Sequence, residues 1–270
     1  MEESAVDLQL DRAHSARMYD YYLGGRTNFV ADREAVGRVI AVFPSILVVA
    51  RANREFMHRS TRFLAEHGIR QFLDIGTGIP TRPNLHEVAQ SVVADARIVY
   101  VDNDPIVLAH AKALLQSRPE GRTAYVEADL NEPEAILASP VLHETLDLGR
   151  PVALSLNAVL PFVPGNEHAL GIVKLLKDAL VPGSALVITH GTDDYDPERR
   201  RFGEVTTIYT SAGTSATTRT RAEFAAFFAG WELAEPGITT TFRWRPEEPE
   251  DLSDITDAEA AAYGAVAFKR

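Results

Sequence analysis

Polar and glycine residues follow three successive apolar segments that are predicted to be β-strands. The residues at these strand ends are Asp74, Gly76, Thr77 and Gly78, then Asp102 and Asn103, then Asp129 and Leu130. The two glycines allow a sharp turn and let a ligand approach the backbone closely. A carboxylate at Asp102 can accept both hydrogen bonds of a ribose diol, and one at Asp129 can accept from an adenine amino group. Aspartate is common at turns, but the combination predicts a nucleoside-binding site.

The type of nucleoside is indicated by two departures from the dinucleotide fingerprint. That fingerprint needs a third glycine three residues after the second, and Thr81 stands there. Asp74 would repel a pyrophosphate, yet it can hold the ammonium of an amino-acid group. S-adenosylmethionine carries adenosine, an ammonium, a carboxylate and a sulfonium, with no phosphate. The pattern therefore favours S-adenosylmethionine as cofactor, with an NAD-dependent oxidoreductase as a distant alternative.

The segments that must position these residues alternate between strand and helix patterns. The predicted strands are 71–75, 97–101, 123–127, 151–156 and 185–189, and the predicted helices are 84–94, 105–116, 132–138, 167–180 and 221–229. Segments 239–244 and 263–268 are predicted to form a closing hairpin. This alternation predicts a doubly wound α/β fold with a mainly parallel sheet, in which ligands bind beyond the carboxyl ends of the strands.

The first 68 residues are predicted to be helical. Helical spacing of apolar residues covers 29–43 and continues after Pro44 from Ile46, with Gly68 as the C-cap. We expect residues 1–68 to be a helical extension or lid packed on an α/β domain of residues 69–270, forming one compact unit.

A polar segment within this extension suggests a role in cofactor binding. A short helix is predicted to end at Leu23, before Gly24 and Gly25. Our hypothesis is that this segment folds over the cofactor, with Arg17 or Arg26 pairing with its carboxylate and with Tyr19 and Gly25 nearby. The alternative is a helix packed on the sheet with its tyrosines in the core.

Composition restricts the possible partners. The chain has 270 residues, a net charge of −11, a pI near 5.2 and no cysteine. The negative charge argues against general nucleic-acid binding, and the basic run Arg199–Arg201 is typical of a solvated helix start. The eight histidines have no metal-binding spacing, so no metal is expected. The acidic N-terminus does not resemble a signal peptide and the apolar runs are too short to cross a membrane, which predicts a soluble cytoplasmic protein, as a monomer or a homodimer.

The chain resembles a known family along nearly its whole length. The run His14 to Phe29, followed by Ala31-Asp32-Arg33, resembles the signature of a bacterial group of S-adenosyl methyltransferases long catalogued as a domain of unknown function. The resemblance continues through 72–81, 101–105, 182–184, 221–228, 244–246 and 263–269. It implies a class I methyltransferase (Rossmann-like) fold with a seven-stranded sheet, S-adenosylmethionine as donor and S-adenosylhomocysteine as product. It does not imply a particular acceptor.

The candidate catalytic residues follow the fourth and fifth strands. Asn157 follows the fourth strand and is included in the predicted cofactor site, while Pro161 stands where the family pattern has a histidine. His190, directly after the fifth strand, is the candidate general base, and the alternative is a histidine that satisfies a backbone carbonyl. We expect residues 191–220 to help form the pocket of a small-molecule acceptor. Because of Pro161, a catalytically silent protein that binds S-adenosylmethionine is a second alternative.

Overall fold

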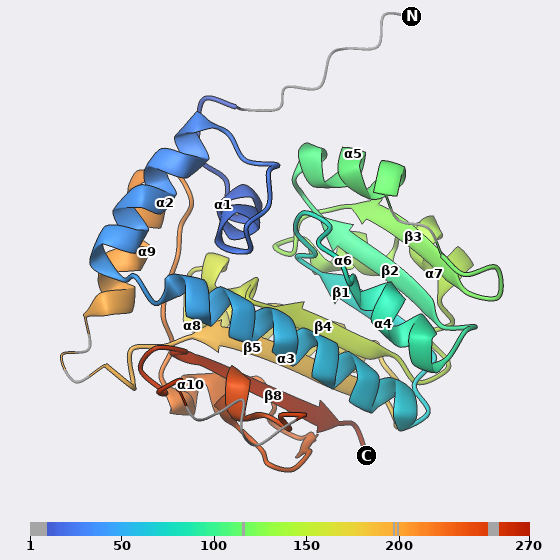
Figure 1. The fold of residues 1–270 in the computed structure, drawn as a ribbon. Coiled ribbons are helices and arrows are strands. Elements are labelled where there is room, and N and C mark those ends of the chain that lie inside the picture. Colours follow the sequence, from blue (N-terminus) through green and yellow to red (C-terminus); the bar gives the residue numbers. More distant parts are fainter. Residues whose placement is uncertain (1–9, 115–116, 197, 199, 248–253) are drawn as a thin grey trace, which may run out of the picture.

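The computed structural model describes residues 10–114, 117–196, 198, 200–247 and 254–270. Its centre is an eight-stranded sheet with the order β3-β2-β1-β4-β5-β8-β6, in which β7 also pairs with β8 (Figure 1). The strands are β1 Gln71–Ile75, β2 Arg97–Asp102, β3 Arg122–Glu127, β4 Ala153–Asn157, β5 Ala185–Gly191, β6 Glu232–Leu233, β7 Thr239–Thr240 and β8 Ala262–Phe268.

The strand pairing confirms the predicted class of sheet. Strands β1 to β5 pair in parallel and β8 runs antiparallel beside β5. The two-residue strands β6 and β7 both pair with β8, along the edge that β5 leaves free. Strands β6 and β7 therefore occupy the same place in the strand order, beside β8. Counted in this way, the sheet has the seven strand positions that the sequence predicts. The strand order reverses between β1 and β4, and ligands bind beside such a point in doubly wound folds.

Side chains alternate between the two faces of the sheet, and each face is covered by helices. Phe72, Ile98 and Val187 pack against α3 (Ile46–Glu66) and α4 (Leu85–Val92). Leu73 and Val99 face the opposite layer. That layer contains α6 Pro133–Leu137, α7 Pro140–Thr145, α8 Asn166–Asp178 and α10 Arg221–Ala226. Helix α5, Pro105–Leu114, connects β2 to β3.

Three helices cover the carboxyl ends of the parallel strands. Figure 1 shows α1 (Ser15–Tyr22) and α2 (Val30–Val42) beside α9 (Arg201–Ser211), which follows β5 much later in the chain. A shared apolar cluster joins them, with Met18, Val36, Phe43, Phe202 and Tyr209 among its members. In the described part of the chain no single helix is long and apolar enough to span a membrane. The pair α2 and α3 passes that test jointly, by length and composition, but is bent by 105°.

The predicted helices and strands agree with the structure within a few residues, except over 239–244, and several observed elements, among them the short strand β6, were not predicted. Helices α7 and α9 were not predicted. In α9, the β-branched residues and Gly203 lower the helix propensity, so its sequence does not indicate a helix. The prediction of a strand over 239–244 is wrong beyond Thr240. There the 3₁₀ helix η2 (Thr241–Arg243) turns the chain toward α3, where Arg59 donates to the carbonyls of Thr241 (2.8 Å) and Trp244 (2.9 Å). The predicted end of α5 at Gln116, like Arg199, lies outside the described residues.

Candidate active site

A cavity of about 500 Å³ lies at the carboxyl ends of the strands, covered by α1, α3 and α9. This volume is within the range of small-molecule sites. Most of the residues that the sequence singles out line it: Arg17, Tyr19, Asp74, Gly76, Thr77, Gly78, Asp102, Asn103, Asp129, Leu130, Asn157 and His190. Gly25 and Arg26, both within the described part of the chain, lie outside the lining, and Arg26 is exposed.

The turn after β1 depends on its two glycines. Gly76 has φ +74° and Gly78 has φ +68°, which is the left-handed region. A Cβ atom on Gly76 would also lie 2.4 Å from Cγ2 of Val159, whereas one on Gly78 would meet open space. The turn therefore passes close to the segment after β4, which brings the two sides of the strand switch point together.

Asp102 holds the turn after β1 against the end of β2. Its Oδ2 accepts from the Gly78 backbone N–H (2.7 Å), and its Oδ1 accepts from the N–H of Asp104 (3.0 Å). Burial raises the pKa of this carboxyl, while the two backbone N–H groups lower it. An ionised carboxylate can accept about four hydrogen bonds, so Asp102 keeps acceptor capacity toward the cavity.

The loop after β3 is tied to the loop after β2. Asn103 Nδ2 donates to Asp129 Oδ2 (3.2 Å), and the other oxygen of Asp129 accepts from the backbone N–H of Asn131 (2.8 Å). Leu130 is buried beside them. Together with the contacts of Asp102, these contacts join the ends of β1, β2 and β3.

Arg54 is a cavity residue that the sequence analysis did not identify. It extends from α3, where its Nη2 donates to the carbonyl of Pro83 (2.8 Å) and to that of Thr81. Its Nε is buried, with no hydrogen-bond partner among the described residues. Burial raises the pKa of Asp74 to about 7, against the opposing effect of the Arg54 guanidinium. The cavity thus carries a guanidinium beside a carboxyl group that titrates near neutrality.

The segment after β4 has an unusual backbone. Ala158 adopts φ +53°, and its N–H donates to Thr189 Oγ1 (2.8 Å). The buried Oδ1 of Asn157 has no hydrogen-bond partner in the described chain. Pro161 lies in the 3₁₀ helix η1 (Leu160–Phe162), and its carbonyl accepts from the Thr217 N–H (2.8 Å). Pro161 therefore connects η1 to the loop 213–217 on the cavity wall.

The geometry of His190 favours the structural interpretation over the catalytic one. Its Nε2 lies 2.7 Å from Nη1 of Arg219, which can only donate, so Nε2 accepts. Its Nδ1 then donates to the Gly191 carbonyl at 2.8 Å. Burial lowers the pKa of His190 to about 3. Both nitrogens of the neutral ring are engaged, so neither is placed to take a proton from an acceptor.

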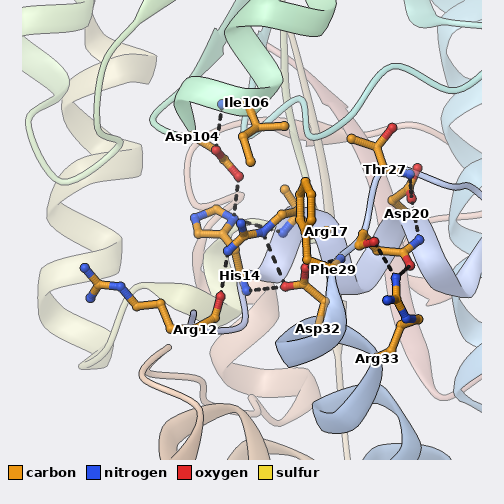
Figure 2. Close-up of polar contacts among 12 residues, drawn as sticks. Arg12, His14, Arg17, Asp20, Thr27, Phe29, Asp32, Arg33, Asp104 and Ile106 are labelled. Atoms are coloured by element: carbon orange, nitrogen blue, oxygen red, sulfur yellow. Dashed lines mark hydrogen bonds and ion pairs between the residues drawn. The ribbon is translucent and has the colours of Figure 1, made fainter. Parts of the chain in front are cut away.

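The polar side chains of α1 form contacts within the protein (Figure 2). Arg17 Nε lies 3.3 Å from Asp32 Oδ1, and its Nη2 donates to the Arg12 carbonyl (2.7 Å). His14 Nδ1 lies 3.0 Å from Oδ2 of Asp104, in the loop after β2. The Arg17 guanidinium is thus engaged with Asp32, and His14 connects the N-terminal segment to the loop that follows Asp102.

Gly25 has a structural role in the same segment. Asp20 Oδ2 accepts from the Thr27 N–H and from Asn28 Nδ2, each at 2.9 Å. A Cβ on Gly25 would lie 2.0 Å from the other oxygen of Asp20. The glycine is therefore required by the turn after α1.

Comparison with known proteins places the chain in a family. The family model for S-adenosyl methyltransferases matches residues 1–270. A DUF574 family protein from Streptomyces avermitilis is 49% identical, with a TM-score of 0.94 over 98% of this chain and 100% of that chain. A protein from Thermobifida fusca, described provisionally as a methyltransferase, is 37% identical, with a TM-score of 0.90 over the full length of both chains. No curated protein sequence matches. The chain belongs to the S-adenosyl methyltransferase family, and it is an enzyme that uses S-adenosylmethionine.

Proposed function

We propose that the cavity binds S-adenosylmethionine at the ends of β1, β2 and β3, and a small-molecule acceptor beside it at the ends of β4 and β5. The observation that carries this proposal is the joining of Gly78, Asp102 and Asp104 in one hydrogen-bonded turn at the cavity wall. The cavity volume of about 500 Å³ supports a small acceptor over a macromolecular one.

The charged and unpartnered groups fit the two ends of this cofactor. Asp102 and Asp129 would accept from the ribose and adenine, with Leu130 and Asn103 beside the ring. The buried Arg54 Nε, unpartnered within the described chain, would donate to the carboxylate. Asp74 and the free Oδ1 of Asn157 would accept from the ammonium. This assignment gives Arg54 the role that the sequence analysis proposed for Arg17 or Arg26.

We assign the N-terminal helices a covering role. Arg17 and Tyr19 of α1 line the cavity, and the Tyr19 hydroxyl donates to the Ala50 carbonyl (3.0 Å) and accepts from Asn53 Nδ2 (2.8 Å). These contacts anchor α1 to α3 above the strand ends. Residues 1–68 then complete a site whose other walls come from residues 69–270, and they exclude water from it.

The reaction needs alignment more than it needs a base. When bound, S-adenosylmethionine supplies a methyl group already activated by its sulfonium. The bound cofactor would give its methyl group to a lone pair of the acceptor, and the electron pair of the broken carbon–sulfur bond would remain on sulfur. The protein orients the acceptor for this in-line attack and keeps water away. His190 takes no proton in this scheme, because both of its ring nitrogens are engaged.

Calorimetry with S-adenosylhomocysteine and S-adenosylmethionine, and with NAD as a control, tests the proposal. We expect one site per chain for each adenosyl ligand, with micromolar affinity, and no binding of NAD. Binding of NAD in preference to S-adenosylhomocysteine, or no binding of any of the three, would contradict the proposed site.

A further inference from the structure

The two halves of the cavity differ in charge. The charged side chains that line it come from the N-terminal segment, from α3 and from the ends of β1, β2 and β3: Arg12, Arg17, Arg54, Asp74, Asp102 and Asp129, with His14. The described residues from 157 to 217 contribute many lining side chains. Among these, there is no lysine, arginine, aspartate or glutamate, and His190 is the one histidine. Its ring is neutral, so no lining side chain of this half of the cavity, which we name the acceptor half, carries a charge. The guanidinium of Arg219 lies behind the His190 ring, outside the lining.

Two tyrosines from distant parts of the sequence meet in the acceptor half. The Tyr22 hydroxyl of α1 lies 3.2 Å from the Tyr209 hydroxyl of α9, and both side chains are buried. Burial raises the pKa of both phenols, that of Tyr209 to about 12, so both are protonated at neutral pH. Their mutual bond uses one of the two protons, and the other has no partner among the described residues. The pair therefore offers one free donor.

Apolar and aromatic side chains surround this pair. Phe162 lies against Tyr209 with ring centroids 5.6 Å apart, and Phe202 packs on Gly191, where any Cβ would meet its ring at 2.7 Å. Ile46 and Val205 also line the cavity, and the polar side chains of this half, among them Thr206, Ser215 and Thr217, are uncharged. An ion placed here would lose its hydration without gaining an oppositely charged side chain in the lining, which is costly, whereas an aromatic ring would gain contacts with Phe162 and Phe202.

We propose that the acceptor is an uncharged aromatic molecule, held through a hydrogen-bond acceptor atom by the Tyr22–Tyr209 pair. This inference rests on the proposed function and names the substrate class of the same site. The tyrosines bind and orient the acceptor beside the sulfonium. The difference in charge between the two halves would then direct each ligand to its own half. The cofactor, which carries charged groups, is favoured beside the charged side chains, and the neutral ring is favoured in the acceptor half.

Binding of four matched probes to protein saturated with S-adenosylhomocysteine tests this proposal. The probes are 2-naphthol, naphthalene, 2-naphthoate and 2-naphthylmethylammonium, measured by ligand-detected NMR. We expect 2-naphthol to bind about fivefold more tightly than naphthalene, which corresponds to one hydrogen bond. We expect its affinity to exceed that of either ion by at least about tenfold.

Conservative variants connect the preference to the tyrosines. The double variant Tyr22→Phe with Tyr209→Phe should bind 2-naphthol and naphthalene about equally, with unchanged affinity for S-adenosylhomocysteine. The control is Tyr21→Phe, because Tyr21 is on the same helix but exposed, and it should keep the preference. The inference would be overturned if either ion bound as tightly as 2-naphthol or more tightly. It would also be overturned if the double variant kept the wild-type preference for 2-naphthol over naphthalene. If the wild-type protein did not bind S-adenosylhomocysteine at all, the proposed function would be overturned instead.

Discussion

The donor half of the cavity and the acceptor half are built in different ways. The donor half, at the ends of β1, β2 and β3, uses carboxylates that hold backbone N–H groups of neighbouring turns, as Asp102 holds those of Gly78 and Asp104. The acceptor half uses side chains from segments far apart in the chain, as in the contact between Tyr22 and Tyr209. The donor half is charged and encoded by local sequence, whereas the acceptor half has uncharged lining side chains and is assembled by tertiary packing.

This difference separates what the two halves can recognise. Fixed carboxylates and the Arg54 guanidinium select a ligand with defined charges, whereas the aromatic wall selects mainly by shape and by exclusion of ions. We therefore expect substitutions in the donor half to change cofactor binding by large factors. Substitutions in the acceptor half should leave it nearly unchanged.

The largest expected effect is at Asp102. Asp102→Ala removes two backbone hydrogen bonds and the proposed ribose contacts, so S-adenosylhomocysteine should bind roughly 100-fold more weakly or worse. Calorimetry measures this loss. Asp95→Ala is the control, because Asp95 is exposed and lies just before β2, at the opposite end of that strand from the cavity. Wild-type affinity in a folded Asp102→Ala protein would remove Asp102 from the site.

Arg54 and Arg51 form a matched pair on α3. Arg54 lines the cavity, and Arg51, one turn earlier, is exposed. Arg54→Met should weaken binding of S-adenosylhomocysteine by about 10–100-fold, because a buried charge-assisted hydrogen bond is lost. Arg51→Met should leave it unchanged. Equal effects of the two substitutions in titration calorimetry would rule out a specific contact with the carboxylate.

The proposed pairing of Asp74 with the ammonium makes binding depend on pH. In the ligand-free protein the Asp74 pKa is raised to about 7, so the carboxyl is largely protonated at pH 6 and ionised at pH 8. An ammonium binds the ionised form, and affinity for S-adenosylhomocysteine should therefore rise by about tenfold between these values. The same titration of Asp74→Asn should be nearly flat. A fall in wild-type affinity over this range would contradict the pairing.

At His190, in the acceptor half, the expected effect is on the stability of the protein and not on cofactor binding. Its folded-state pKa is lowered to about 3, below its usual value, so the unfolded chain binds a proton that the folded one does not as the pH falls from about 6.5 toward 3. This group then reduces the free energy of unfolding by up to about 1.4 kcal/mol per pH unit within that window, and it has no such effect above it.

Urea denaturation of His190→Gln tests this linkage. The variant should lose less stability than the wild type between pH 6.5 and pH 4, and its affinity for S-adenosylhomocysteine at pH 8 should be unchanged. Parallel stability profiles for the two proteins would show that His190 is not buried in its neutral form.

The sequence was informative about the donor half because its determinants are local. Gly76 and Gly78 are required by the backbone conformation of one turn. Asp74, Asp102 and Asp129 each lie at the end of a strand or just after it, and apolar patterning indicates those strands. Arg54 was missed because its signal is weak. It sits on a long amphipathic helix between buried residues, and a helical pattern does not tell which end of the sheet the helix crosses.

The acceptor half could not be predicted in the same way. Helix α9 is rich in threonine and contains Gly203, so its sequence does not favour a helix strongly. Its position depends on contacts such as Phe43 with Phe202, whose ring centroids are 5.2 Å apart. The polar groups of α1 were predicted to bind the cofactor, but Arg17 pairs with Asp32, a partner that spacing in the sequence did not reveal.

A crystal structure of the complex with S-adenosylhomocysteine tests the division of the cavity most directly. We predict the ribose hydroxyls on Asp102, the amino-acid end between Asp74 and Arg54, and the sulfur facing η1, with no part of the ligand between Tyr22 and Phe162. A ligand lying against the Tyr22–Tyr209 pair, or a ribose remote from Asp102, would contradict the account.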